Sequence, residues 1–362
     1  MKDKLKFFIE NFHDVVLLFY IKHRSRWLVK KKLNNGLEKI DPEYGRKCRA
    51  YWKRYSGINT TEWHNFYSRK SGKKDLRYIP EDVFYTKIEP YFNNLKFCKA
   101  YSDKSLYSLW FQGAVLPKTI FKNVAGVNYD DGFNILDKES VLDLLSNEKK
   151  LIFKASIESG GGKNIDVLEH EGESSWAQRI ALAIEEFDEN FVVQRFLEQH
   201  PVMGSLNPSS VNTIRMITLF LDNDVHVLSS HVRIGVDGAF YDHGGIVCGV
   251  SEDGVLSDVA YKYKVGDAVA EHPQGYPFSG VEVPSYEEMK AQAIRQHKKF
   301  AHFKLISWDF AVDSGSRPVL IEYNLRWQGL NHHQLTNGPL FGGLTEKVLE
   351  RVFLEGKHGA RS

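Results

Sequence analysis

The segment at residues 303–331 constrains the fold of this chain more than any other, because its pattern predicts a β-hairpin. Two apolar runs, Ser307–Val312 and Pro318–Asn324, flank the turn-forming residues Asp313–Arg317. Both runs carry acids within otherwise apolar sequence, WDFAV and VLIEYN. An unpaired carboxylate is costly to bury, so each acid is expected to lie at the surface or beside a compensating charge.

The register of this hairpin predicts which polar side chains meet. If Val312 lies opposite Val319, Asp309 lies opposite Glu322, and Asn324 projects from the same face as Glu322 because side chains alternate along a strand. Neighbouring carboxylates repel and need a cation, and oxygen ligands that leave room for water and phosphate suit Mg²⁺. The plainer alternative is a hairpin with solvent-exposed acids. The apolar surroundings favour the metal site, provided that the chain also holds a nucleotide site.

The composition is that of a globular protein with more than one domain or lobe. The chain has 362 residues, of which 42% are hydrophobic and 26% are charged. The net charge is only +2, but residues 1–75 hold 19 Lys and Arg against 8 Asp and Glu, a balance of +11 that leaves −9 for the rest. A basic N-terminal segment therefore precedes an acidic body.

Cysteine usage and hydropathy bear on the compartment. Cys48, Cys98 and Cys248 are widely spaced and form no C-x-x-C motif, which argues against a disulfide framework or a zinc site. No apolar run is long enough to cross a bilayer. Residues 1–24 mix acids with apolar residues and lack a small-residue cleavage site, so they do not read as a signal peptide. We expect a cytoplasmic protein, with peripheral contact at the inner membrane face left open.

The first 100 residues are predicted to be mostly helical and basic. Apolar residues recur at helical spacing between Leu5 and Phe19. Basic side chains follow at residues 22–32, and residues 46–55 interleave Arg and Lys with aromatic residues. Such stretches bind nucleic acid, an anionic membrane, or an acidic glycan or lipid phosphate, or they form the solvated face of a helix. The sequence does not choose among these alternatives.

A phosphate-binding element is predicted at residues 151–164. The strand Leu151–Ser156 places Lys154 on one face, and the loop after it holds three consecutive glycines at residues 160–162. Consecutive glycines let backbone N–H groups approach an anion closely. The loop is not a Walker A motif, because Lys163 is followed by Asn. A flexible hairpin tip is the alternative, but a lysine on a buried strand face needs an anion, which a bound phosphate would supply.

Further strands carry two arginines. A strand is predicted at residues 191–196, and residues 212–221 and 225–236 form a strand pair. Arg215 and Arg233 lie in the interiors of the paired strands, where an arginine is costly to bury without a partner. Surface exposure is one explanation, and a polyanionic ligand is the one we favour.

Together, the strand lysine, the glycine-rich loop, the strand at residues 191–196, the paired arginines and the D…E-x-N hairpin resemble the ATP-grasp superfamily. The resemblance runs from about Asp103 to the C-terminal helix. The segments DKSLYSLWFQGAVLPKT, SVNTIRMIT, HGGI and WDFAV…PVLIEYN look like the sugar-transfer-associated branch, including teichuronopeptide-biosynthesis-like proteins. The resemblance implies an α+β fold in which two lobes grip ATP. We expect a helical extension at residues 1–100, an N-terminal lobe with the phosphate loop at 101–193 and a C-terminal lobe with the Mg²⁺ site at 194–362.

The resemblance also implies roles for individual residues. Lys154 would contact the α- and β-phosphates of ATP, and Arg215 and Arg233 would stabilise the transferring phosphoryl group. A lid over the phosphates is implied for Ser159, Gly160, Gly161, Gly162 and Lys163. The adenine and ribose site is implied for Gln194, Arg195, Phe196 and Glu198, although ATP-grasp hinges often carry an acid where Arg195 stands. Mg²⁺ would be held by Asp309, Glu322 and Asn324. Substrate contacts are implied for Asn212, His243, Gly244, Gly245, Arg326 and Asn331.

These roles imply an ATP- and Mg²⁺-dependent ligase that joins a carboxylate to an amine through an acyl phosphate. The branch resemblance implies an acidic sugar or carrier-linked acceptor and an amino acid or other amine, in capsule or other surface-polysaccharide biosynthesis beside glycosyltransferases of the same pathway. No nucleic-acid partner is expected. One alternative is a kinase that phosphorylates a hydroxyl with the same residues. Another is a nucleotide-binding protein without enzymatic activity, whose basic N-terminus grips nucleic acid or membrane.

Overall fold

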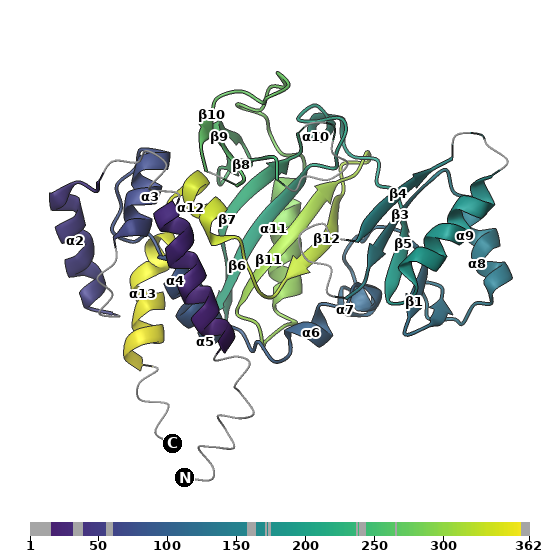
Figure 1. Cartoon of the computed structure of the whole chain (residues 1–362), viewed down its shortest axis with the longest axis horizontal. Coiled ribbons are helices and arrows are strands. Elements are labelled where there is room, and N and C mark those ends of the chain that lie inside the picture. The colour runs from purple at the N-terminus through teal and green to yellow at the C-terminus, as the bar shows by residue number, and fades with distance from the viewer. Residues whose placement is uncertain are drawn as a thin grey trace, which may run out of the picture.

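The computed structural model describes residues 16–31, 39–55, 61–157, 164–170, 172, 175–236, 238, 244–264 and 266–355. Two antiparallel sheets with flanking helices form the body, and helices from the N-terminal part of the chain pack at one end (Figure 1). The predicted α+β fold with a helical N-terminal region is confirmed. Within the described ranges, no helix combines the length and apolar character needed to cross a bilayer.

The first sheet has the strand order β2-β1-β5-β3-β4. Its strands are β1 (Thr119–Val124), β2 (Val127–Tyr129), β3 (Lys150–Ala155), β4 (Ile165–Glu169) and β5 (Phe191–Arg195). Along β3, Leu151 and Phe153 are fully buried, whereas Lys154 on the opposite face is half-buried. The buried face packs against α8 (Lys138–Ser146) and α9 (Trp176–Phe187), which lie on the side away from the second sheet (Figure 1). The face with Lys154 is therefore free of these helices.

The second sheet has the strand order β10-β9-β8-β7-β6-β11-β12. Its strands are β6 (Thr213–Leu221), β7 (Asp224–Ile234), β8 (Ile246–Val250), β9 (Leu256–Lys262), β10 (Ala268–Val269), β11 (Leu305–Val312) and β12 (Pro318–Asn324). Alternate residues of β6 enter different cores, because successive side chains point to opposite faces. Ile214 packs with Met289 of α11 (Tyr286–His297), whereas Ile217 packs with helices on the other face. Arg215 shares this second face with Ile217.

The β6–β7 hairpin is closed by a tight turn that the sequence predicts. Asp222 and Asn223 have φ angles of 54° and 64°. Positive φ at both central residues matches the twist of the flanking strands, and Asn and Asp tolerate this conformation better than most residues. The turn aligns Arg215 of β6 with His231 of β7, and Thr213 with Arg233.

The β11–β12 hairpin reaches its predicted register by a route that the sequence analysis did not foresee. The assumed pairing of Val312 with Val319 is wrong, because Val312 lies opposite Pro318. A bulge between Phe310 and Asp309 then admits one extra residue on β12. Beyond that bulge Asp309 lies opposite Glu322, as predicted.

The N-terminal helices cover the face of the second sheet that α11 leaves open. They are a helix at residues 16–31, α2 (Pro42–Lys53), α3 (Glu62–Ser71), α4 (Glu81–Val83), the π-turn η1 (Phe84–Ile88) and α5 (Glu89–Phe92). Trp52, Phe84 and Ile88 share a core with Leu219 of β6 and with Val348 of α13 (Thr345–Glu350). These helices are therefore continuous with the core of the second sheet.

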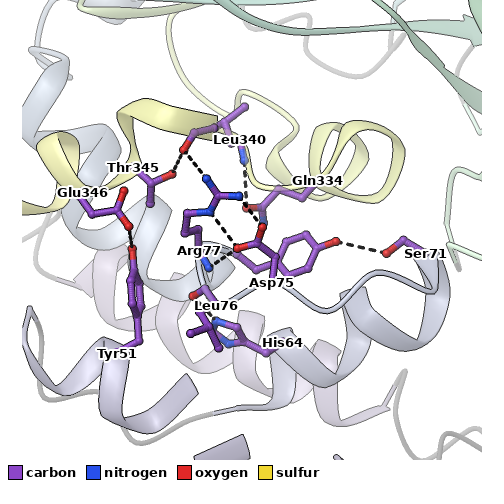
Figure 2. Close-up of polar contacts among 12 residues, drawn as sticks. Tyr51, His64, Ser71, Asp75, Leu76, Arg77, Gln334, Leu340, Thr345 and Glu346 are labelled. Carbon is purple, nitrogen blue, oxygen red and sulfur yellow. Dashed lines mark hydrogen bonds and ion pairs between the residues drawn. The ribbon is translucent and has the colours of Figure 1, made fainter. Parts of the chain in front are cut away.

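Polar contacts between these helices and the C-terminal part of the chain reinforce this docking (Figure 2). The Tyr51 hydroxyl donates to Glu346 Oε1 at 2.9 Å, and Arg77 Nη1 donates to the Gly342 carbonyl at 3.4 Å. Gln334, on α12 (Leu330–Asn337), is fully buried. Its Oε1 accepts from the Ile79 N–H at 2.8 Å, and its Nε2 donates to the Ile79 carbonyl at 2.9 Å.

Several boundaries differ from the sequence-based expectations. Helix α11 ends at His297, and the chain then folds back to bury Phe300 and Phe303 in the core beneath it. Strands β1, β2, β4 and β8–β10 were not predicted. The remaining short elements are α6 (Cys98–Tyr101), η2 (Lys104–Leu106), α7 (Tyr107–Trp110), α10 (Pro201–Gly204), η3 (Gly342–Leu344) and η4 (Arg351–Glu355).

Replacing Gln334 by Ala should destabilise the protein by roughly 2–4 kcal/mol, because it leaves the buried Ile79 N–H and carbonyl without partners. Asn337→Ala is the matched control, since this amide lies on the same helix but is exposed, and it should cost about 1 kcal/mol or less. Urea denaturation of both variants measures the difference. Equal losses would show that the Gln334 bridge does not hold the N-terminal helices in place.

Candidate active site

The centre of the candidate site is a buried carboxylate between two arginines. Arg215 Nε and Nη2 lie 2.7 Å and 2.6 Å from Asp309 Oδ1 and Oδ2, respectively, and Arg233 Nη2 lies 3.1 Å from Asp309 Oδ2. Asn324 Nδ2 donates to Asp309 Oδ2 at 3.2 Å. Asp309 is 1% exposed. The cluster joins β7, β6, β11 and β12, which are consecutive in the sheet.

Strand pairing explains why these charges meet. Asp309 lies directly opposite Arg215 across the β11–β6 ladder, and Arg233 lies opposite Thr213, to whose hydroxyl it donates. Burial raises the pKa of Asp309, but the charges of Arg215 and Arg233 outweigh it, so the pKa of Asp309 lies below its usual value. The arginines thus have a partner within the chain. The sequence-based argument that they need a polyanionic ligand to be buried is wrong.

A second charged group faces this cluster from the other lobe. Lys104 Nζ, at the start of η2, lies 2.9 Å from Glu322 Oε1, and the backbone N–H of Lys104 donates to the Ser156 carbonyl at 2.9 Å. Lys154 Nζ donates to Gln194 Oε1 at 3.1 Å. Burial, and then the charge of Lys104, lowers the pKa of Lys154 to about 8, against the opposing effect of Glu322. The two lysines and Glu322 therefore lie close enough to interact electrostatically.

The charge balance of this site favours an anionic ligand. Four cations, Lys104, Lys154, Arg215 and Arg233, face the two carboxylates Asp309 and Glu322. Among these six side chains, positive charges outnumber negative charges by two. In a partly desolvated site, this excess attracts a polyanion such as a nucleoside triphosphate.

The predicted metal ligands fit a divalent cation by their chemistry. Asp309, Glu322 and Asn324 present two carboxylates and an amide on adjacent strands, and such oxygen donors suit Mg²⁺. In the structure both carboxylates are neutralised by arginine and lysine. A cation that arrives with phosphate would find carboxylate ligands here and cationic side chains for the phosphate oxygens. Among the described residues, no group of three or more His, Cys, Asp or Glu side chains is arranged to hold a metal ion.

A pocket of about 550 Å³ lies at the hinge between the two sheets, a size common for small-molecule sites. Its wall includes Arg195, Phe196 and Glu198, three of the four residues predicted to bind adenine and ribose. Arg195 is held by Glu148 through bonds of 2.8 Å and 2.6 Å. The fourth residue, Gln194, does not line this pocket. It contacts Lys154 instead.

Other residues assigned to the substrate have structural partners. Asn212 is fully buried, and its Nδ2 donates to the carbonyls of Met203 and Asn207 while its Oδ1 accepts from the Ser210 hydroxyl. These bonds hold the loop before β6. The predicted substrate role is therefore not supported for Asn212.

Asn331 and Gly245 also serve the fold. Asn331 Nδ2 donates to Glu81 Oε2 at 3.0 Å and its Oδ1 accepts from the Tyr67 hydroxyl, so it ties α12 to the N-terminal helices instead of facing the hairpin acids. A Cβ on Gly245 would lie 2.0 Å from the Ile234 carbonyl oxygen, which explains a glycine there by packing. The predicted substrate contacts of both residues are not supported by these positions.

The remaining predicted site residues lie in loops or outside the described residues. Gly244 has a φ of 88°, a conformation that favours glycine. The Arg326 guanidinium lies 5.0 Å from the Trp327 ring, beside the loop that follows β12. His243 and the predicted lid, Ser159, Gly160, Gly161, Gly162 and Lys163, lie outside the described residues, and their roles stay predictions.

The structure brings to the site several residues that no sequence pattern predicted. Lys104 is far from Glu322 in sequence, and nothing in the local pattern points to their pairing. Three histidines, His231, His332 and His333, lie next to the arginines: the His231 and His333 rings are 4.4 Å apart, and the charges of Arg215 and Arg233 help to lower the pKa of His231, after the larger effect of burial. The pKa of His333 is likewise lowered by burial, so His231 and His333 lie beside the arginines without competing as cations for Asp309.

Replacing Asp309 by Asn should destabilise the protein by about 3–5 kcal/mol, because the buried Arg215 and the largely buried Arg233 lose the carboxylate that they share. The matched control is Glu148→Gln, which removes the same kind of bidentate pair from Arg195, whose side chain is 56% exposed. That change should cost about 1 kcal/mol or less. Denaturant titrations near neutral pH compare the two. A small, equal loss in both would show that Asp309 is not the partner that allows the arginines to be buried.

Comparisons with known proteins bear on this arrangement. A family model described as "Sugar-transfer associated ATP-grasp" matches residues 86–350, which is well over half of the chain. A comparison with curated proteins finds no match to this chain.

Solved structures similar to this chain include proteins described as ligases or synthetases. The ATP-grasp ligase PsnB with a minimal precursor is 15% identical with a TM-score of 0.40, covering 72% of this chain and 64% of its own. N5-carboxyaminoimidazole synthetase from Staphylococcus aureus is 11% identical with a TM-score of 0.41, covering 67% and 51%. An L-amino acid ligase from Bacillus licheniformis is 13% identical with a TM-score of 0.39, covering 71% and 48%. This chain thus spans about half to two thirds of their length. By the family match over residues 86–350, the chain belongs to the sugar-transfer associated ATP-grasp family.

Proposed function

We propose that this protein is an ATP-dependent carboxylate–amine ligase that works through an acyl phosphate. The observation that carries the proposal is the pairing of the two hairpin carboxylates, Asp309 and Glu322, with cations from both lobes: Lys104 on one side, Arg215 and Arg233 on the other. Membership of the ATP-grasp family supports ATP as the bound polyanion.

The reaction follows from the need to activate a carboxylate. An oxygen of the substrate carboxylate attacks the γ-phosphorus of ATP, the bond from that phosphorus to the bridging oxygen breaks, and ADP leaves. The amine then attacks the acyl carbon, the bond to the phosphate oxygen breaks, and the amine loses a proton. The products are an amide, ADP and phosphate, and the protein needs no covalent nucleophile.

The residues of the site would act by positioning and by charge. Lys154 and Lys104 lie on the side of the first sheet and would hold phosphate oxygens, while Arg215 and Arg233 would stabilise the charge of the group in transfer. Preorganised cations in a water-poor site are effective because they need no reorganisation as the charge develops. Reactant alignment supplies the rest of the acceleration.

Asp309, Glu322 and Asn324 would hold Mg²⁺, which would neutralise phosphate charge when bound. The pairing of Arg215 and Arg233 with Asp309 holds these cations beside the carboxylate that would bind Mg²⁺.

We further propose that the acid is a sugar acid or a carrier-linked sugar and that the amine is an amino acid, in the synthesis of a surface polysaccharide. The support is the description of the family as sugar-transfer associated. On this proposal the protein works beside the glycosyltransferases that build the same polymer.

The test is product analysis of purified protein with ATP, Mg²⁺, a panel of nucleotide-linked uronic acids and pooled amino acids. The expected outcome is ADP and phosphate release that requires both an acid and an amine, with a new mass equal to the sum of the two minus water. A stable phosphorylated acceptor would instead indicate a kinase, and AMP with pyrophosphate would refute the acyl-phosphate route. Nucleotide binding without turnover on any mixture would indicate a binding protein.

Replacing Glu322 by Gln should lower the rate of ADP release by about 10²–10³, the scale seen when one preorganised electrostatic group is lost. Stability should change by about 1 kcal/mol or less, because the Glu322 side chain in its pair with Lys104 is 30% exposed. Glu43→Gln, which breaks a Lys–Glu pair of similar length on α2, is the control and should keep the wild-type rate. If Glu322→Gln turns over as fast as its control, the metal assignment is wrong.

A further inference from the structure

The helix at residues 16–31 has an outer face that the rest of the described chain leaves uncovered. Its inner face docks through Ile21, Ser25 and Val29, which are buried and recur every four residues. Arg26 Nε donates to Asp82 Oδ2 at 2.9 Å and fixes the helix against α4. Leu17 and Leu18 also pack against the core. The helix is therefore held in one orientation, and most of its other side chains are exposed.

The outer face is aromatic. Phe19 is 65% exposed, Tyr20 59% and Trp27 59%, and Val16 is 48% exposed. Among the described residues, six aromatic side chains are strongly exposed, and three of them lie on this one helix. Phe19 and Trp27 are eight residues apart, so the exposed aromatics span about 12 Å of the helix, with exposed Lys22, His23 and Arg24 between them. Single exposed apolar residues are ordinary, but three exposed aromatics on one helix indicate an interaction surface.

The same face is cationic. Residues 16–31 contain Lys22, Arg24, Arg26, Lys30 and Lys31 and no acidic residue. All but Arg26 are exposed. At the same end of the molecule, α2 and the residue that follows it expose Arg46, Lys47, Arg49, Lys53 and Arg54. Figure 1 places these helices at the end of the molecule far from the first sheet, so the surface lies apart from the candidate active site.

We propose that the outer face of the helix at residues 16–31 binds an anionic lipid surface, with Phe19, Tyr20 and Trp27 in the headgroup region and the lysines against lipid phosphates. Exposed aromatics on a basic helix face suit a helix that lies in the plane of a membrane interface. A second copy of the chain is a poor partner, because the two cationic faces would repel. Single-stranded nucleic acid prefers a cationic groove with stacking platforms, whereas this surface is a convex helix that also exposes aliphatic Val16.

This proposal is independent of the ligase activity, since none of its residues belongs to the candidate site. It predicts a protein that partitions onto membranes by one end and keeps both sheets outside the bilayer. Binding of this kind adds apolar burial to charge attraction, so it should require both the aromatic residues and anionic lipid.

The experiment is co-sedimentation of the full chain with vesicles of phosphatidylcholine alone and of phosphatidylcholine with phosphatidylglycerol. The expected outcome is binding to the anionic vesicles only, weakened by salt. The triple variant Phe19→Ser, Tyr20→Ser, Trp27→Ser should bind at least about tenfold more weakly, because binding scales with buried apolar area. Changing Lys22, Lys30 and Lys31 to Gln should cost roughly fivefold per lysine. Melting temperatures should match the wild type, because these side chains face solvent.

The matched control is Ile135→Ser with Lys138→Gln, which removes an exposed apolar residue and an exposed lysine from the other lobe. It should bind like the wild type. Trp27→Phe should keep binding but lose the fluorescence quenching that brominated lipids cause at Trp27. Unchanged binding of the triple variant, or no vesicle binding by the wild type, overturns the proposal. So does tighter binding to single-stranded RNA than to anionic vesicles through the same residues.

Discussion

The carboxylate of Asp309 between Arg215 and Arg233 is the interaction on which the rest of this structure depends. A buried charge is tolerated only when it is paired and hydrogen-bonded, and here one anion neutralises two cations across neighbouring strands. The pairing leaves one positive charge in excess at the core of the second sheet. A site that holds an excess of positive charge out of water favours an anion, and the anion that we propose is ATP.

The N-terminal helices cover the face of the second sheet that carries this cluster, and so they shield it from water. Arg215 lies on the same face of β6 as Ile217 and Leu219, and those two residues pack with Phe84 and Ile88 of the N-terminal region. Gln334 and Asn331 then fix α12 against the same region through buried hydrogen bonds. The N-terminal helices are thus part of the wall around the site, and their outer surface remains available for a different task.

The two lobes meet through the segment at residues 103–119. Lys104 reaches across to Glu322, its backbone bonds to Ser156 at the end of β3, and the Val115 carbonyl accepts from the Leu320 N–H. Each of these contacts joins the segment at residues 103–119 to one of the two sheets, so the segment links the sheets. The Lys104–Glu322 pair therefore joins the two lobes directly beside the candidate site.

The sequence by itself determined the hairpin acids and the paired strands with Arg215, because these rest on local alternation and turn chemistry. The α+β class followed from the resemblance of its motifs to the ATP-grasp superfamily. The sequence did not determine what neutralises the acids. The pairing of Asp309 with the arginines and of Glu322 with Lys104 joins residues far apart in the chain, and only strand order and the docking of the lobes bring them together. The sequence did not predict that Asn212 holds the loop before β6, for the same reason. The same amide side chain can bind a ligand or a backbone carbonyl, and its burial and its neighbours in the fold determine which of the two it contacts.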